Sequence, residues 1–416
     1  MINQLSFVFF VLWILPVSAQ VSSFDPVMQH ALGSHETTPC RAGVNVLYMV
    51  NSNAVTNSFI DKSFTAGFID DTEKLRVENR LKDVNRMGYA LDYGLYFRAP
   101  LSKHSYIIAG GSVIEHFNAR FNSGLFNLVF NGNSRFAGQE VNLHPFRYLY
   151  YTYEKVFGGI EYYHSNEMAF SGSLSFIKGS RFQQMDFNRA VLYTSPLGDS
   201  VNLAADMSMD FAREGVKRMD AWFGFGTAIN LSAIFYQRPA GIRWQVQLND
   251  LGFIRWNSID QYRKNGNTVF TGIRIDDFFA TTDTIISSVG YDSIEDLIDM
   301  QHNNGKAMFF LPFTGEISTE KQFFEKVYIG CGLRFYAGPG ALPLIFVNST
   351  IHFPYRFYIR PVLAFGGYGA GDIGLGVYKH LGKNIFLGTE TWFIEDFFAP
   401  RFTSGQGVSF TLSGLF

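Results

Sequence analysis

The amino-acid sequence predicts an all-β fold: a transmembrane antiparallel up-and-down β-barrel of about 14 strands. Three observations lead to this prediction. Apolar residues alternate with small or polar ones in repeated stretches of about ten residues, the period of a β-strand. Aromatic residues gather near the ends of these stretches, where a membrane barrel carries its interfacial girdles. The N-terminus reads as an export signal, which directs the chain away from the cytoplasm.

The composition excludes several classes of protein. Of 416 residues, 47% are hydrophobic and 17% are charged, so the chain has ample apolar surface and is not disordered. A net charge of −2 makes nucleic acid an unexpected partner. Beyond the leader, no apolar run reaches the 18 residues of a spanning helix. Two cysteines, Cys40 and Cys331, are too few for a disulfide scaffold, and whether they pair stays open.

The leader determines the expected domain organisation. Leu5–Leu15 is almost entirely apolar, Pro16 interrupts it, and small residues precede a cleavage site between Ala19 and Gln20. The run is too short to span a membrane. No linker or repeat divides the remainder. We therefore expect a signal peptide at 1–19, an N-terminal extension at 20–39 and a single barrel domain at 40–416.

Strands are expected wherever the period-2 pattern recurs between turn residues. Met87–Pro100 and His104–Phe117 form a predicted hairpin, preceded and followed by long polar loops. The other expected strands are Gly43–Val50, Phe146–Val156, Phe157–Ser165, Met168–Gly179, Ser200–Ala212, Ala221–Gln237, Gly241–Trp256, Thr268–Asp277, Lys326–Gly338, Leu342–Phe353, Tyr355–Gly367, Gly371–Gly382, Asn384–Asp396 and Gly407–Phe416.

One segment has helical spacing. Ile294, Leu297, Ile298 and Met300 share a face, with Ser293 as N-cap, which predicts a short loop helix near 291–303. Such a helix could lie across the mouth of the barrel as a lid or plug.

Two architectures can bury the apolar strand faces. A soluble sandwich would pack two sheets together, whereas a membrane barrel turns these faces to lipid and keeps small and polar residues inside. Strand length, terminal aromatics and alternating short and long loops favour the barrel. Interior residues are then expected among Gly172, Ser173, Ser175, Gly224, Gly226 and Thr227.

The C-terminal strand resembles the signal by which outer-membrane barrels are delivered to the barrel-assembly machinery. Val408, Phe410, Leu412 and Phe416 match that pattern, while Gly414 departs from it. This last strand must also pair with the first one, near Gly43–Val50, because a sheet in lipid has to close.

Beyond about residue 40, the chain resembles a family of outer-membrane barrels of unknown function found in Bacteroidota. Ser173–Leu203, Trp222–Trp256 and the strand TVFTGIRIDD carry the resemblance, and NDLGFIRW is its most specific part. More distantly, the chain is similar to fatty-acid-transporter barrels and to PorV-like barrels of a secretion system. The transporters have an N-terminal hatch with Asn-Pro-Ala, whereas VNSNAVTN (Val50–Asn57) lacks the proline, which puts such a hatch in doubt.

The sequence offers little chemistry. Nine scattered histidines lie in no nucleophile elbow or zinc motif, so we expect no enzyme and no cofactor. Hard oxygen ligands in an acidic stretch are compatible with Ca²⁺, but no calcium-loop spacing accompanies them, and a solvated loop is the alternative. These weak metal candidates are Asp276, Asp277, Asp292, Glu295 and Asp296.

The expected function is that of a transport or accessory barrel in the outer membrane of a Gram-negative bacterium. It would give small apolar molecules a passive route, with outer-membrane lipid and the barrel-assembly machinery as partners. The alternative is a non-conducting adaptor that docks a partner such as a secretion component.

Overall fold

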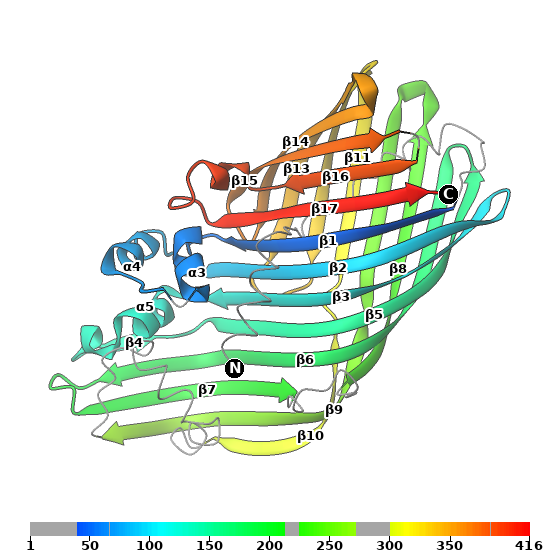
Figure 1. The fold of residues 1–416 in the computed structure, drawn as a ribbon. Helices are drawn as coiled ribbons and strands as arrows, with labels where there is room; N and C mark the ends of the chain where they lie inside the picture. Colours follow the sequence, from blue (N-terminus) through cyan, green and yellow to red (C-terminus); the bar gives the residue numbers. More distant parts are fainter. Residues whose placement is uncertain (1–39, 66, 213–223, 272–299, 383) are drawn as a thin grey trace.

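The computed structural model describes residues 40–65, 67–212, 224–271, 300–382 and 384–416, which form one closed antiparallel barrel of 14 wall strands (Figure 1). The strands are β1 (Arg41–Ser52), β2 (Asn85–Ser102), β3 (Ser105–Phe121), β4 (Glu140–Asn142), β5 (Phe146–Ser165), β6 (Met168–Thr194), β7 (Ser200–Ala212), β8 (Gly224–Gln237), β9 (Ile242–Thr271), β10 (Gln301–Phe310), β11 (Thr314–Phe324), β12 (Val327–Tyr336), β13 (Leu342–Phe353), β14 (Phe357–Gly367), β15 (Gly371–Leu381), β16 (Ile385–Thr391) and β17 (Gly405–Leu415).

Three pairs of strands each share one position in the wall, which reduces seventeen strands to fourteen wall positions. β7 and β8 both pair with β6, β10 and β11 both pair with β9, and β4 continues the line of β5 along β6. The sheet closes where β17 pairs with β1, with Val44 opposite Leu412 and Leu47 opposite Ser409. The predicted barrel is therefore confirmed, including the pairing of the last strand with the first.

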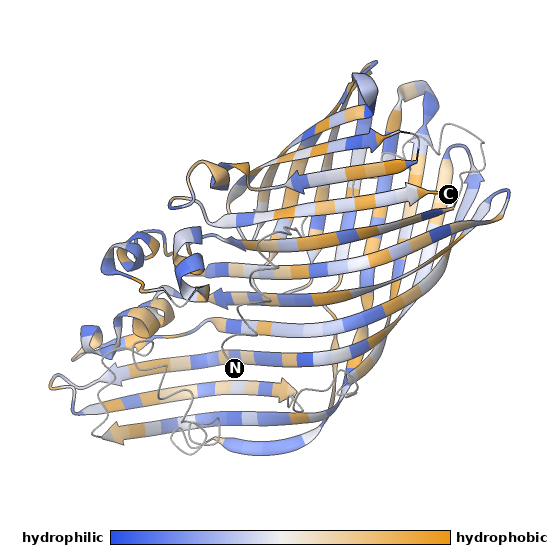
Figure 2. Ribbon diagram, viewed as in Figure 1, coloured by the Kyte–Doolittle hydropathy of each residue, from blue (hydrophilic) through white to orange (hydrophobic). Residues whose placement is uncertain are grey.

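Along each strand, apolar side chains on the outer face alternate with side chains that face the interior, which is the two-residue period of a β-strand. In β14, Leu363 is 49% exposed on the outer face, whereas its neighbour Val362 is 2% exposed and faces inward. Every wall position contributes at least one large apolar residue that is exposed on the outside, and the banded colouring of Figure 2 follows this alternation. One such residue from each wall position is Val44, Leu95, Ile107, Ile160, Phe176, Phe225, Val246, Ile317, Leu333, Val347, Leu363, Ile373, Ile385 and Leu412.

A β-bulge in β9 preserves this alternation along the longest strand. Leu231 of β8 lies opposite Leu248 and Ile229 lies opposite Leu251, so β9 carries one residue more than β8 between these pairs. Asp250 takes the left-handed conformation, with φ 58°, and its N–H donates to Asn230 Oδ1 at 2.9 Å. Without the extra residue, every side chain beyond the bulge would face the opposite side.

The two rims of the barrel differ. The terminal rim, which holds Arg41 and Leu415, has short connections, such as the η2 turn (Arg238–Ala240) and the η3 turn (Pro354–Arg356). The loop rim carries the segments 53–84, 122–145 and 392–404, which contain α3 (Asn57–Phe64), α4 (Asp71–Glu78), α5 (Ser123–Asn131), η1 (Asn133–Phe136) and η4 (Ile394–Phe397). The part of the chain that the structure describes contains no helix long and apolar enough to cross a membrane.

Side-chain caps begin the three helices. Thr56, Asp70 and Asn122 each accept a hydrogen bond from the backbone N–H three residues later. At Asp70, a hydrogen bond from Lys62 Nζ (2.9 Å) and the cap bond hold the pKa of the carboxyl below its usual value. The helices were not expected from the polar sequence around them.

The helices α3, α4 and α5 pack at the loop rim against the outer face of β1, β2 and β3. Phe59, Val77 and Phe126 of the helices share one buried cluster with Val50 and Phe121 of the wall. The helices thus cover the outward side chains that would otherwise continue the apolar surface of these strands.

Several predicted elements need correction. The expected strands Phe146–Val156 and Phe157–Ser165 form the single strand β5, and the expected strand Asn384–Asp396 ends at Thr391. Residues Gln301–Asn303 were expected at the end of a helix near 291–303, but they begin β10 and pair with Arg263–Gln261 of β9. The long β9 extends beyond the neighbouring wall and offers unpaired backbone groups, which this stretch satisfies as a strand. Residues 291–299 lie outside the described residues.

The close approach of β8 and β9 at Gly226 leads to a prediction that compares two glycines. A Cβ at Gly226 would lie 1.9 Å from the carbonyl oxygen of Phe253 on β9, whereas a Cβ at Gly158 would meet nothing within 4 Å. We expect Gly226→Ala to destabilise the barrel by about 1–3 kcal/mol or more, because backbone has to shift. Denaturant unfolding followed by tryptophan fluorescence measures this cost. Equal midpoints for Gly226→Ala and the control Gly158→Ala would contradict the packing described.

Candidate functional site

The interior of the barrel is lined by charged side chains that are paired with one another. Five ion pairs face inward: Lys155–Asp250 at 2.7 Å, Arg98–Glu161 at 2.9 Å, Arg243–Glu320 at 2.9 Å, Arg360–Glu390 at 3.6 Å and Arg334 with Glu316. Large apolar residues thus face outward while these five ion pairs face inward, the reverse of a soluble protein. One ion pair, Lys178–Glu154 at 3.4 Å, joins positions on the outer face. Because each charge in these five pairs has an opposite neighbour, the pairs themselves attract an ion only weakly.

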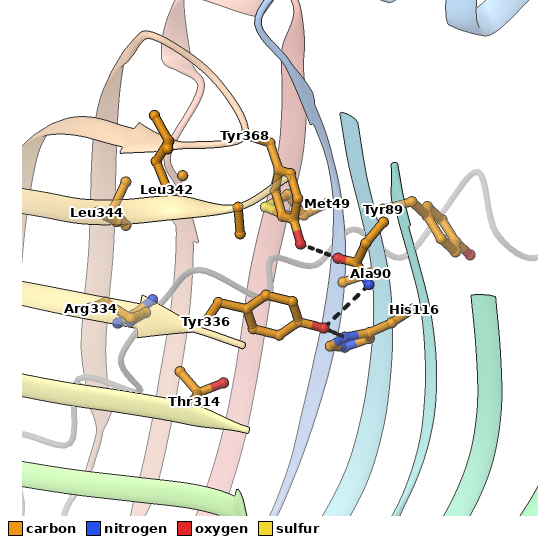
Figure 3. A pocket seen from close by; sticks show the side chains of 13 residues that line it. Met49, Tyr89, Ala90, His116, Thr314, Arg334, Tyr336, Leu342, Leu344 and Tyr368 are labelled. Atoms are coloured by element: carbon orange, nitrogen blue, oxygen red, sulfur yellow. Dashed lines mark hydrogen bonds between the residues drawn. The ribbon is translucent and has the colours of Figure 1, made fainter. Parts of the chain in front are cut away.

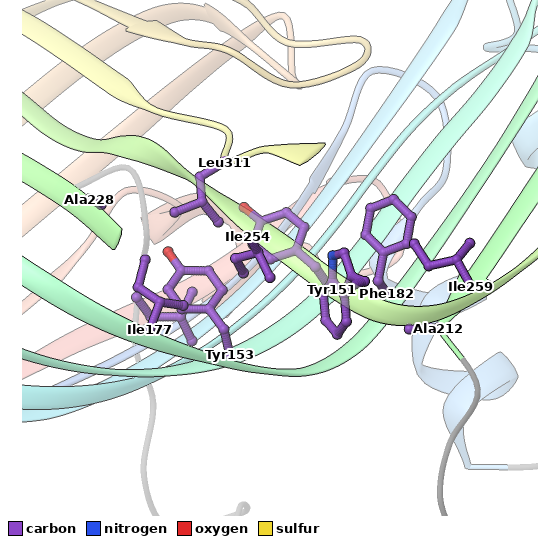
Figure 4. Close-up of a cluster of buried hydrophobic side chains, with 11 residues drawn as sticks. Tyr151, Tyr153, Ile177, Phe182, Ala212, Ala228, Ile254, Ile259 and Leu311 are labelled. Carbon is purple, nitrogen blue, oxygen red and sulfur yellow. The ribbon is translucent and has the colours of Figure 1, made fainter. Parts of the chain in front are cut away.

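Two apolar clusters also fill the interior, on two sides. The first cluster, called the β9 cluster, contains Tyr151, Ile177, Phe182, Trp256 and Leu311 among its members (Figure 4). Its side chains come mainly from β5, β6 and β9 and point toward one another. The second cluster, called the β13 cluster, contains Leu344 and Phe346 of β13 together with Met49, Tyr368 and Trp392.

A hydrogen-bonded bridge crosses the lumen between these clusters. It joins His116 of β3 to Tyr336 of β12, which have five wall strands between them on one side and seven on the other. His116 Nδ1 lies 2.9 Å from Tyr336 Oη, and Tyr151 Oη lies 2.8 Å from the same oxygen. Asn118 Nδ2 donates to Tyr336 Oη at 3.4 Å, and the Tyr368 hydroxyl donates to Asn118 Oδ1. These hydrogen bonds show that the end of β12 and β3 approach each other closely across the lumen.

A pocket of about 450 Å³, including its solvent-open part, lies beside the bridge near the loop rim (Figure 3). Its apolar lining comes from Met49, Ala90, Ala341 and Leu344, and its polar lining comes from His116, Asn118, Arg334, Tyr336 and Tyr368. Figure 3 shows Tyr336 and His116 meeting end to end, with Tyr368 above them.

The polar groups of the pocket are already satisfied by the protein. Arg334 Nε donates to Glu316 Oε2 at 2.7 Å, and its guanidinium lies 5.8 Å from the ring centre of Phe346 and 5.5 Å from that of Trp392. The bridge uses the hydroxyls of Tyr336 and Tyr368. A bound molecule therefore meets mostly aromatic rings and methyl groups and needs no charge of its own.

The sequence-predicted site residues have different outcomes. Val408, Phe410 and Leu412 face outward on β17, and Phe416 is 77% exposed at the terminal rim. Their role as an insertion signal remains a prediction. The cleavage site at Ala19 and Gln20 and the acidic candidates Asp276, Asp277, Asp292, Glu295 and Asp296 lie outside the described residues.

Four of the six expected interior residues do face inward. Ser173 and Ser175 accept hydrogen bonds from the inward amide of Asn230, and Gly224 and Gly226 are buried on the same side of β8. The prediction is wrong for Gly172 and Thr227, which lie on the outward side of the wall with Leu174, Phe176 and Phe225. The cross-lumen bridge was missed. Its only signal in the sequence was the pair of polar residues His116 and Asn118 on one face of a strand.

Both cysteines are free thiols. Among the described residues, no group of three or more His, Cys, Asp or Glu side chains could hold a metal ion.

The Arg334–Glu316 pair generates a prediction. Arg334→Met leaves the Glu316 carboxylate buried without a cation, which should cost about 3–5 kcal/mol in the free energy of unfolding. The double variant Glu316→Gln/Arg334→Met should recover much of that loss. The half-exposed Arg147, 3.4 Å from Asp186, provides the control, since Arg147→Met should cost under about 1 kcal/mol. Equal costs for the two single variants would exclude a buried interior pair.

Three solved structures are similar to this chain over most of its length. The toluene transporter TodX of P. putida is 8% identical, with a TM-score of 0.47 over 92% of this chain and 91% of that one. A fatty-acid-transporter (FadL) homologue of Pseudomonas aeruginosa is 9% identical, with a TM-score of 0.43 over 91% and 90%. The Ralstonia pickettii toluene transporter TbuX is 8% identical, with a TM-score of 0.43 over 93% and 92%.

No curated protein matches the sequence. The family of unknown function DUF5723 matches residues 35–390, which is most of the sequence. The chain belongs to this family.

Proposed function

We propose that the chain is an outer-membrane barrel of a Gram-negative bacterium that admits small uncharged apolar molecules through its loop rim. The observation that carries this proposal is the combination of an apolar belt outside and an apolar pocket inside. The protein acts as a passive route and not as an enzyme.

The belt supports a membrane location. Large exposed apolar residues occur at all 14 wall positions, including Leu95, Phe176, Leu333 and Leu363. A continuous surface of this kind far exceeds the few hundred Å² of apolar patch that a soluble monomer tolerates. In lipid the same surface is stabilising, and the closed sheet leaves no backbone group unpaired at its edges.

The pocket supports an uncharged apolar occupant. Met49, Ala90 and Leu344 supply apolar surface, while Arg334 is neutralised by Glu316 and screened by rings. A carboxylate in this pocket would have to compete with Glu316 for the guanidinium. A hydrocarbon ring or short alkyl chain leaves all of these bonds intact, so it binds at a lower cost.

Filling the pocket tests the proposal. Ala90 is 2% exposed and faces into the pocket, so Ala90→Trp should occupy the space without changing the outer surface. We expect the uptake of radiolabelled toluene by Gram-negative cells to rise when the chain is expressed. With Ala90→Trp, uptake should fall back to the level of cells that lack the protein.

The matched control is Ala109→Trp. Ala109 lies on the outer face of β3, opposite Phe97, so its substitution leaves the pocket unchanged and should preserve uptake. If the chain and both variants leave uptake at the background level, the proposed route is wrong. Stoichiometric recovery of a partner protein from mild detergent would then favour the adaptor instead.

A further inference from the structure

The two interior clusters meet at a polar seam. Tyr151 belongs to the β9 cluster, Tyr368 belongs to the β13 cluster, and Tyr336 packs against the β13 cluster. The hydrogen bonds of His116, Asn118 and Tyr336 join them. We name these five residues the seam: His116, Asn118, Tyr151, Tyr336 and Tyr368. The clusters and the seam form a row of contacting side chains that crosses the lumen beside the pocket, and we name this row the septum.

The residues of the seam make hydrogen bonds to one another. A tyrosine hydroxyl offers one proton and two lone pairs, and Tyr336 Oη has three partners, His116, Asn118 and Tyr151. Tyr151 Oη also lies 2.9 Å from His116 Nδ1. The rings lie close as well, with centroids 5.4 Å apart for His116–Tyr151 and 5.9 Å for His116–Tyr336. These contacts hold the seam together without a ligand.

The seam differs from the rest of the septum in how it can separate. The side chains of each apolar cluster pack closely against one another; the ring centroids of Phe182 and Trp256, for example, lie 5.6 Å apart. Separating these side chains would expose buried apolar surface to water. Across the seam, in contrast, rotation of one side chain breaks several hydrogen bonds, and water can replace them. The seam is therefore the easiest line along which the septum can open.

Tyr336 is also placed to move. It is the last residue of β12, and the loop that follows contains Gly338 and Gly340, the latter with φ 83°. A Cβ on Gly338 would lie 2.4 Å from the Tyr336 ring, so the glycine makes room for the ring in its closed position. The ring can swing without breaking the ladder between β12 and its neighbours.

We propose that Tyr336, held by His116 and Tyr151, is the gate between the pocket and the remaining lumen, which deepens the proposed function and rests on it. An apolar molecule in the pocket lies against the rings of Tyr336 and Tyr368. When it displaces the Tyr336 ring, the seam parts and the pocket joins the lumen beyond. Closure returns when the three-way hydrogen bond forms again.

Ion flux through the purified barrel in planar lipid bilayers tests the gate directly. The wild-type protein should be closed for most of the recording. Tyr336→Ala should raise the mean conductance several-fold, and Tyr336→Phe should give brief openings because the ring stays and the hydroxyl is lost. Gly338→Ala should also open the barrel, since the added methyl displaces the ring while leaving the seam residues unchanged.

The control is Tyr328→Ala. Tyr328 lies on the same inward face of β12, eight residues from Tyr336, and stacks on His352 away from the seam. This variant should remain as closed as the wild type. Slower migration after boiling on a denaturing gel identifies correctly folded protein for every variant.

Two results would overturn the gate. One is a folded Tyr336→Ala barrel as closed as the wild type, and the other is a wild-type barrel that conducts steadily. The experiments distinguish a failure of the gate from a failure of the proposed function. Toluene uptake that depends on Ala90 with an inert Tyr336→Ala removes the gate alone. A conducting Tyr336→Ala with uptake insensitive to Ala90→Trp removes the apolar route alone.

Discussion

The pairing of β17 with β1 is the constraint on which the rest of the structure depends. Eleven residue pairs, from Arg41–Leu415 to Asn51–Gly405, join the two ends of the wall. An open sheet would leave two edges of unpaired N–H and C=O groups, which neither lipid nor an apolar outer face can satisfy. Once the sheet closes, each side chain faces either outside or lumen, and the division between apolar belt and paired charges follows.

A second consequence of closure concerns β-bulges: a bulge must leave apolar side chains facing outward on both sides of it. The bulge at Asp250 does so in β9, where Trp244 and Val246 face outward before it and Leu251 and Phe253 face outward after it. Asp250 also reaches Lys155 across two intervening strands, so the bulge supplies an interior charge as well. The stretch NDLGFIRW, the most specific part of the sequence resemblance, thus has a structural role in the wall.

The fold could be predicted from the sequence because strand patterning is local. The alternation in Gly43–Val50 and Gly407–Phe416 is visible in ten residues, and family membership is confirmed, whereas the Bacteroidota origin stays a prediction. The site could not be predicted in the same way. His116 and Tyr336 are 220 residues apart, and only the folded barrel brings them together across the lumen. Gly172 and Thr227 were misplaced because small residues carry no facing preference of their own.

The most direct test of this account is a nitroxide scan along β14 of the barrel in lipid bilayers. Labels at Pro361, Leu363 and Phe365 should be accessible to oxygen, which concentrates in lipid, and shielded from a water-soluble nickel complex. Labels at Val362 and Ala364, which are buried inside, should be shielded from both reagents. Equal accessibility at all five positions, or nickel access at the odd-numbered ones, would contradict a closed wall with its apolar face in a membrane.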